Sequence, residues 1–293
     1  MISVIISSAN NTLLKQVTEN ITATIGVPFE IIAIDNSTGK LGICAVYNQG
    51  AQQAQYDILC FMHEDIIIET QGWGTILEDT FTNHPEIGLL GVVGGGYKPF
   101  TNSSWSGLGY ENVFCNFIQS YKYEKKETYL DYRNPNNKTS VDFVACVDGL
   151  WLATTKKIAT EIKFDEDTFK GFHAYDLDFS IAVGQKYKVA VTFEILMNHL
   201  SDGSYSRDWV EENFRLHKKW AKQLPINAQN YTFKQRAHME KVTYKDFVKK
   251  LIKLGFPVSI AYDILKDKRY RDMGIYWKLR FFLFKKFTFK NNG

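Results

Sequence analysis

Three polar side chains that can bind a metal ion, His63, Glu64 and Asp65, follow directly on a short apolar run, Ile58 to Met62. An uninterrupted apolar run of this length predicts a strand buried on both faces of a parallel sheet. The three side chains would then emerge at the carboxyl end of that strand, where open α/β sheets bind their ligands. The alternative is a solvated acidic turn after a core strand.

Three further polar clusters fall where predicted strands end or predicted helices begin. Asp35 and Asn36 follow a second apolar strand, the segment 175–178 (Tyr-Asp-Leu-Asp) opens a helix, and His199 follows the last strand. If these clusters converge on one face of a sheet, their carboxylates and imidazoles could hold a divalent cation that bridges substrate phosphates. A carboxylate that is free of the metal could serve as a general base.

The elements that must position these residues alternate between strands and helices over the first 65 residues. Such a β-α-β-α-β order predicts a parallel sheet with right-handed crossovers. Residues 97–139 show no clear period, which predicts a long irregular insertion that is functional or mobile. The predicted strands cover 4–7, 30–34, 58–62, 87–93, 141–147 and 188–195, and the predicted helices begin near 13, 43, 73 and 171.

Composition indicates a folded globular protein of one large domain with an appendage, because 45% of the 293 residues are hydrophobic and 23% are charged. The four cysteines are widely spaced and form no CxxC pair, which predicts buried free thiols in a reducing compartment. The amino terminus lacks the basic segment and long apolar run of a signal peptide, so it is interpreted as a first strand. A cytoplasmic location is the resulting expectation.

Charge is distributed unevenly along the chain. Residues 236–293 carry 15 Lys/Arg against 5 Asp/Glu, whereas residues 1–235 carry 20 against 27. A basic tail predicts contact with an anionic surface, and its aromatic residues favour lipid over nucleic acid. Residues 274–290 are too charged to span a bilayer. Because their apolar residues lie all round a helical wheel, two interpretations stay open: peripheral binding at the inner face of the membrane, or packing on the body or a subunit partner.

Five motifs occur in order along the chain: Cys-Ala-Val-Tyr-Asn (44–48), Phe-Met-His-Glu-Asp (61–65), Val-Asp-Gly (147–149), Gly-Phe-His-x-Tyr-Asp-x-Asp (171–178) and His-x-Ser-x-Gly (199–203). Together with Asp35, this series resembles the GT-A glycosyltransferases of family 2, and most closely a bacterial branch that carries these motifs. The resemblance covers about residues 1–220. It implies a Rossmann-like α/β fold, with a mostly parallel sheet flanked by helices in a catalytic domain (1–207) and a C-terminal helical appendage (208–293).

The resemblance also implies which residues bind the donor. The metal-binding Asp-x-Asp motif of such enzymes falls on His63 and Asp65, so an imidazole replaces the first acid. Asp65 is therefore the first metal ligand, with His63 as a second ligand or a ribose contact, and His199 completes the coordination of Mn²⁺ or Mg²⁺. The implied nucleotide-sugar site comprises Ser7, Ser8, Asp35, Asn48, His63, Glu64 and Asp65.

The implied reaction is inverting transfer of a sugar from a nucleotide sugar, with a UDP-sugar as the favoured donor, to a glycan or lipid-linked acceptor. Asp176 is the expected base and Asp178 the second choice, while Asp148 and Trp151 would border the acceptor. Polysaccharide biosynthesis is the natural setting. Two alternatives stay open. One is a nucleotidyltransferase, although residues 8–11 (Ser-Ala-Asn-Asn) lack the glycines and base of its usual loop. The other is a degenerate GT-A domain that binds glycans or nucleotides without catalysis.

Overall fold

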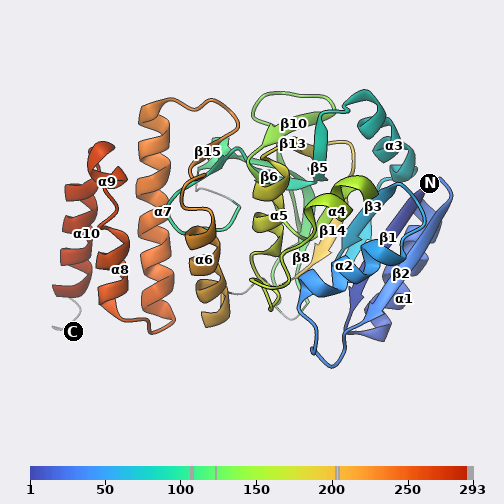
Figure 1. Ribbon diagram of the computed structural model, residues 1–293, viewed down its shortest axis with the longest axis horizontal. Helices are drawn as coiled ribbons and strands as arrows, with labels where there is room; N and C mark the ends of the chain where they lie inside the picture. The colour runs from blue at the N-terminus through green and yellow to red at the C-terminus, as the bar shows by residue number, and fades with distance from the viewer. Residues whose placement is uncertain (106–108, 123, 202, 204, 289–293) are drawn as a thin grey trace.

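A computed structural model describes residues 1–105, 109–122, 124–201, 203 and 205–288, and its centre is a seven-stranded sheet (Figure 1). The strand order is β10-β13-β5-β12-β3-β1-β2. β1 pairs in parallel with β2 and β3, and β13 pairs in parallel with β5, whereas β12 and β10 run antiparallel to their neighbours. The predicted mostly parallel sheet is thus confirmed. The strands are β1 (Ile2–Ser8), β2 (Phe29–Asp35), β3 (Ile58–Met62), β5 (Ile87–Gly91), β10 (Val141–Val144), β12 (Trp151–Thr155) and β13 (Lys188–Thr192).

A second sheet, with strand order β11-β6-β8-β14-β4, lies beside the first and carries β9 on β8. β8 and β9 fall within residues 97–139, so the expectation of an irregular insertion is wrong for this part. A small third sheet pairs β15 with β7. The strands are β4 (Ile66–Ile68), β6 (Val93–Gly95), β7 (Tyr97–Lys98), β8 (Val113–Ser120), β9 (Tyr129–Arg133), β11 (Cys146–Val147), β14 (Met197–Leu200) and β15 (Ile226–Asn227).

The central sheet is buried on both faces, as its apolar strands predict. Successive side chains of β3 alternate between two hydrophobic clusters, with Leu59 and Phe61 in one and Cys60 and Met62 in the other. All four cysteines are buried free thiols. Five helices accompany this part of the chain: α1 (Asn11–Thr24), whose first turn is capped by the Asn10 side chain, α2 (Ile43–Gln53), α3 (Trp73–Asn83), α4 (Lys156–Ile162) and α5 (Tyr175–Val183).

The C-terminal helices stand in a row beyond α5, at the end of the molecule opposite β1 and β2 (Figure 1). One hydrophobic cluster includes Phe179 of α5 and Leu216, Tyr244 and Leu279 of the following helices. The core therefore crosses residue 207, and the domain boundary there stays a prediction. Within the described residues, no helix is both long and apolar enough to cross a membrane. These helices are α6 (Arg207–Lys219), α7 (Phe233–Lys253), α8 (Val258–Ile264), α9 (Arg269–Asp272) and α10 (Tyr276–Thr288).

Candidate active site

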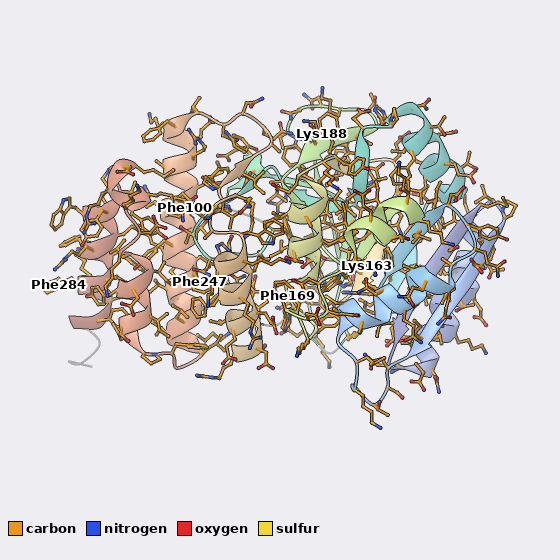
Figure 2. All side chains as sticks on the ribbon, in the orientation of Figure 1. Phe100, Lys163, Phe169, Lys188, Phe247 and Phe284 are labelled. Atoms are coloured by element: carbon orange, nitrogen blue, oxygen red, sulfur yellow. The ribbon has the colours of Figure 1, made fainter. Side chains whose placement is uncertain are left out.

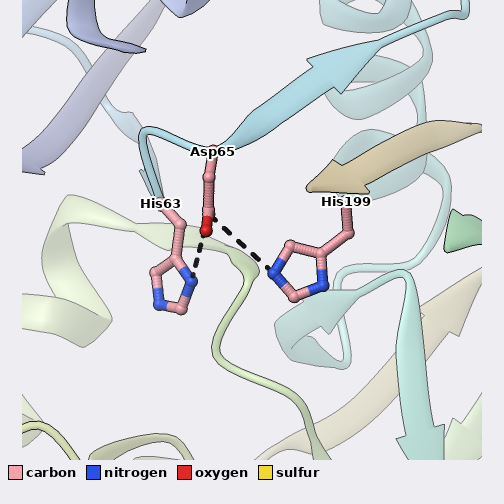
Figure 3. A group of neighbouring side chains, drawn as sticks. All are labelled: His63, Asp65 and His199. Atoms are coloured by element: carbon pink, nitrogen blue, oxygen red, sulfur yellow. Dashed lines mark ion pairs between the residues drawn. The ribbon is translucent and has the colours of Figure 1, made fainter. Parts of the chain in front are cut away.

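Three metal-capable side chains meet where the two sheets adjoin. His63 follows β3, Asp65 precedes β4, and His199 lies on β14, which pairs with β4 and so places His199 opposite Ile66. The Oδ1 atom of Asp65 is 3.8 Å from His63 Nδ1 and 3.8 Å from His199 Nε2 (Figure 3). The three potential ligand atoms all lie within 4.8 Å of one another. Residues far apart in sequence thus form one compact group of two imidazoles and a carboxylate.

The carboxylate of Asp65 has one bonded oxygen and one oxygen that lacks a donor. Its Oδ2 accepts a hydrogen bond from Lys122 Nζ at 2.8 Å, while Oδ1 is buried without a hydrogen-bond partner among the described residues. Burial alone would raise the pKa of Asp65, but the charges of His63 and His199 when they are protonated, together with the Lys122 ammonium, outweigh it and hold the pKa below its usual value. A buried acceptor without a donor costs about 1–3 kcal/mol. A cation bound between the two imidazoles would satisfy it.

Tyr175 determines which nitrogen of His63 carries the proton. The Tyr175 hydroxyl donates to the carbonyl oxygen of Gly149 at 2.9 Å, so its single proton is used. It must therefore accept from Nε2–H of His63, which lies 2.8 Å away. Nδ1 is then left with a lone pair facing Asp65. Burial lowers the pKa of His63, which favours the neutral ring. A neutral imidazole whose other nitrogen donates to a fixed partner is the usual form of a metal-binding histidine.

The glycine of the Val-Asp-Gly motif is needed for this arrangement. A Cβ atom on Gly149 would lie 2.1 Å from the Tyr175 hydroxyl, which is closer than any real contact. The residue before Tyr175, Ala174, adopts the left-handed region with φ of +64° as it begins α5. Such a conformation is uncommon for a non-glycine residue and is often retained at functional sites. The turn into α5 is thus shaped to present Tyr175 and the next residue, Asp176.

Asp176 is a carboxylate whose pKa is raised toward neutrality. Burial is the main cause, the nearby charge of Asp148 adds to it, and together they raise the pKa of Asp176 to about 7. The Asp176 Oδ2 atom accepts from the backbone N–H of Gly149 at 3.1 Å. Asp148 is itself held by the indole N–H of Trp105 at 2.5 Å and by the N–H of Leu150 at 2.9 Å. A carboxylate with this pKa can take up a proton near pH 7.

Two cavities meet at the His-Asp-His group. The first has a volume of about 390 Å³ and the second about 890 Å³, and both are lined by His63, Asp65, Lys122 and Phe172. The first cavity extends past the end of β1 and the loop after β2, toward Ser7, Ala9, Asn36 and Glu64. The second cavity extends toward the start of α5 and α6 and is also lined by Trp105, Asp148, Asp176, Tyr205 and Trp209. A two-part substrate could therefore react at their junction.

Several predicted donor-site residues lie in or beside the first cavity. Ser7 and Glu64 line it. Ser8 does not line it. The Ser8 hydroxyl instead donates to Glu64 Oε2 at 2.9 Å and so orients the Glu64 side chain. Asp35 is exposed next to Asn36, which lines the cavity, and it accepts from the backbone N–H of Ser37 at 2.9 Å. A backbone and a side-chain hydrogen bond from Ser37 lower the pKa of Asp35.

The structure places three other predicted site residues away from both cavities. The side chain of Asn48 is bonded in both directions to the backbone of Phe164, at 2.8 and 3.0 Å. Trp151 is fully buried with its ring 6.3 Å from that of Trp73, in the hydrophobic cluster that also contains Ala153 of β12. Asp178 is 2% exposed and is bonded to the region that follows α5. None of these three residues lines either cavity, so their predicted roles at the site stay predictions.

Asp178 joins α5 to the C-terminal helices. Its carboxylate accepts from Lys219 Nζ at 2.9 Å and from the indole N–H of Trp220 at 2.7 Å.

Sequence reasoning missed two functional candidates at the site, Lys122 and Trp105. Both residues lie within 97–139, and the only signal in the sequence is the aromatic and polar composition of that segment.

The strand order of the sheets and the helices around them are those of a GT-A glycosyltransferase fold. The group of His63, Asp65 and His199, which could hold a cation, lies within this fold. Residues 3–231 match the model of the family described as "Glycosyltransferase like family", and the chain belongs to that family. It is accordingly an enzyme of the glycosyltransferase class. The finer motif-based assignment to a bacterial branch of family 2 stays a prediction. No curated protein gives a significant match.

Two solved structures are similar to this chain at low sequence identity, and the first of them supports the fold. A crystal structure of GalNAc-T7 with UDP, GalNAc and Mn²⁺ matches with a TM-score of 0.52 and 10% identity over 76% of this chain. This chain covers 49% of that one, about half its length. A structure of S. aureus TarS 1–349 in complex with UDP matches with a TM-score of 0.48 and 12% identity, covering 85% of this chain and 71% of that one.

Proposed function

We propose that the chain is an inverting glycosyltransferase that moves a sugar from a nucleotide-sugar donor, with a UDP-sugar favoured, to a hydroxyl group of a glycan or lipid-linked acceptor. One observation carries the proposal: a cation-ready group stands at the junction of two cavities, and the larger cavity holds Asp176, whose pKa is raised to about 7. The GalNAc-T7 structure, which has the same fold, contains UDP and Mn²⁺. That content supports the choice of donor and cation.

The donor nucleotide is proposed to occupy the first cavity, with its diphosphate at the junction. Asp35 and Ser7 would face the nucleoside, and Glu64, held by Ser8, would border it. His63, Asp65 and His199 would hold the metal, and when bound the metal would offset the charge that develops on the leaving diphosphate. Two imidazoles with one carboxylate favour Mn²⁺ over Mg²⁺, because Mg²⁺ prefers oxygen ligands.

The acceptor is proposed to occupy the second cavity. Aromatic side chains such as Trp105, Tyr205 and Trp209 line it and can stack on sugar rings. The acceptor oxygen would attack the anomeric carbon while its proton passes to a carboxylate oxygen of Asp176. The bond from the anomeric carbon to the diphosphate oxygen breaks with its electron pair leaving on the diphosphate. One displacement from the opposite face inverts the configuration and needs no covalent intermediate.

The test measures both binding and turnover. Melting temperature is recorded with UDP-sugars, with and without Mn²⁺, since a ligand selective for the native state raises it. Release of UDP and transfer to sugar acceptors are measured in parallel. Asp65→Ala should lose the Mn²⁺-dependent part of the stabilisation, whereas Asp79→Ala, an exposed carboxylate on α3, should keep it. No response to any nucleotide sugar with Mn²⁺ would refute the proposal. Binding without turnover would support the alternative of a noncatalytic domain.

The cellular setting that we propose follows from the nature of the proposed donor and acceptor. A cytoplasmic enzyme of polysaccharide biosynthesis that rests on the inner face of the membrane would meet both a soluble donor and a lipid-linked acceptor.

A further inference from the structure

The outer face of α10 carries three large aromatic side chains that are exposed to solvent. Trp277 is 74% exposed, Phe281 57% and Phe284 54%. At 100° per residue, positions 277, 281 and 284 fall within an arc of about 60°. Figure 2 labels Phe284 at the outer edge of the row of helices. Contiguous exposed apolar surface of this kind marks an interaction site in soluble proteins.

The inner face of the same helix accounts for its other apolar residues. Leu279 and Leu283 are fully buried in the core cluster that includes Tyr244 of α7. Phe282 and Phe287 are partly buried against that cluster. The inner and outer faces together explain why apolar residues lie all round a helical wheel of this segment. One face holds α10 on the body, as one interpretation of the tail expected, and the opposite face stays available for a partner.

The charges around the outer face are of one sign. α10 contains Lys278, Arg280, Lys285 and Lys286 and no acidic residue. On the helix, Arg280 lies on one side of the aromatic stripe, and Lys278 and Lys285 lie on the other. The Arg280 guanidinium is 5.9 Å from the ring of Trp277, and Lys285 Nζ is 4.7 Å from the ring of Phe281. The surface thus combines aromatic rings with cations that lie over them.

We propose that this outer face of α10 binds the surface of an anionic lipid bilayer. Aromatic rings favour the boundary between headgroups and acyl chains, and Lys and Arg side chains next to them are attracted to anionic headgroups. A second copy of the chain fits less well, because a symmetric contact would bring together the three cations that flank the stripe on each α10. The inference rests on the membrane setting of the proposed function and names the surface that would make the contact. Because it uses no residue of the active site, vesicle binding and sugar transfer can fail independently.

The first experiment separates the aromatic contribution. Full-length protein is floated with vesicles of phosphatidylcholine alone or of equal parts phosphatidylcholine and phosphatidylglycerol. Binding is expected only to the second kind. Trp277→Ser/Phe284→Ser should lower the partition coefficient by about 100-fold, because each buried aromatic contributes about a factor of ten. Phe233→Ser is the matched control, since Phe233 of α7 is also 54% exposed but lies off this face, and it should bind like the unmodified protein.

The second experiment separates the charge contribution. Lys278→Gln/Lys285→Gln should weaken binding to the anionic vesicles by about 10-fold or more. Lys15→Gln on α1, whose side chain is 77% exposed, should not weaken it. Unchanged melting temperature and UDP-sugar hydrolysis would show that the variants are folded. Equal binding to neutral vesicles, equal binding by the aromatic double variant, or absence of vesicle binding with capture of an acidic protein instead would each overturn the proposal.

Discussion

Two carboxylates, the fully buried Glu240 in the C-terminal helices and the half-buried Asp65 at the junction of the sheets, differ in how their oxygens are bonded. Glu240 accepts from the Tyr97 hydroxyl at 2.8 Å and from the backbone N–H groups of Phe100 and Thr101 at 3.0 and 3.1 Å. Both of its oxygens therefore have donors. Asp65 keeps one buried oxygen without a donor among the described residues. Complete bonding marks a carboxylate that stabilises the fold, and incomplete bonding marks one that can bind a ligand.

The same contrast occurs within a single helix. Asp176 and Asp178 are two residues apart on α5 and therefore point about 200° apart around its axis. Asp178 is bound by Lys219 and Trp220 of the C-terminal region. Asp176 lines the larger cavity. Helix phase thus directs one carboxylate to the C-terminal region and the other to the larger cavity, although the two lie close together in the sequence motif.

Substitution of Asp176 should have the largest effect. Asp176→Asn removes the proposed base and should lower kcat by about 10²–10⁴-fold. Nucleotide binding should be retained, because Asp176 does not line the first cavity. Asp178→Asn is the matched control: it should lower the melting temperature by loosening the contact with Lys219, yet leave kcat within about a factor of three. Similar kcat losses in both variants would remove the distinction between the two carboxylates. Steady-state kinetics and calorimetry provide the readouts.

The pH dependence should follow the same residue. Only ionised Asp176 can accept the proton, and its pKa is raised from 3.8 to about 7. The value of kcat/KM should therefore rise with pH, reach a plateau above neutrality and have its midpoint at or below about pH 7, since a bound cation lowers the pKa of a nearby carboxyl. The Asp178→Asn profile should match that of the unmodified enzyme. A profile that falls between pH 5 and 8 would argue against Asp176 as the base.

Stability should separate Glu240 from Asp65. Glu240→Ala leaves a hydroxyl and two backbone N–H groups without their acceptor, so the free energy of unfolding should fall by about 3 kcal/mol or more. Asp65→Ala removes a carboxylate of which only one oxygen has a donor. Without added metal, the free energy of unfolding should therefore change by about 1 kcal/mol or less. Urea denaturation with and without Mn²⁺ tests both. A loss in Asp65→Ala as large as that in Glu240→Ala would show that incomplete bonding does not distinguish the two sites.

Local pattern was sufficient to predict the elements that carry the site. β3 and α3 have the bounds expected from their apolar runs, and His63 and Asp65 follow the carboxyl end of β3, as expected for an open α/β sheet. His199 reaches them by a different route from the one expected, because it lies on β14 of the second sheet, which pairs with β4.

Contacts between distant segments could not be predicted in the same way. β8 was missed because it is defined by pairing with β6 and β14, and its own sequence shows no simple alternation. Trp151 is predicted to border the acceptor because aromatic faces stack on sugars, yet its strand β12 is buried on both faces, and sequence alone does not show that its side chain packs in the core. The contact of Lys122 with Asp65 joins two loops and has no local signature.

Tyr175 offers a smaller test of the site, directed at its geometry. Tyr175→Phe removes the acceptor that holds Nε2–H of His63, so the ring is free to change tautomer and orientation. Affinity for Mn²⁺ should fall about 10- to 100-fold, as for other partners of metal-binding histidines. Tyr231→Phe is the control, because its hydroxyl also donates to a backbone carbonyl, that of Glu111. Mn²⁺ binding followed by electron paramagnetic resonance needs no turnover. Equal affinities in the two variants would contradict the role of Tyr175.

Lys122 should give the smallest effect, and its direction is the informative part. The Lys122 ammonium lies 2.8 Å from Asp65 Oδ2 and so neutralises part of the negative charge that would attract a metal ion. Lys122→Gln should therefore strengthen Mn²⁺ binding, by about 3- to 5-fold for an ion pair of about 0.7–1 kcal/mol. If Lys122 then moves to the donor diphosphate, the same variant should bind UDP more weakly in the presence of Mn²⁺.

The control for this variant is Lys170→Gln, because Lys170 also lines the first cavity but has no bond to Asp65 among the described residues. It should leave Mn²⁺ affinity unchanged. Weaker Mn²⁺ binding in Lys122→Gln would mean that Lys122 orders Asp65 for the metal instead of competing with it. The half-bonded carboxylate would then resemble Glu240, as a group whose partners are already in place. Stronger binding would instead show that a side chain of the protein serves as a replaceable counter-ion at this site.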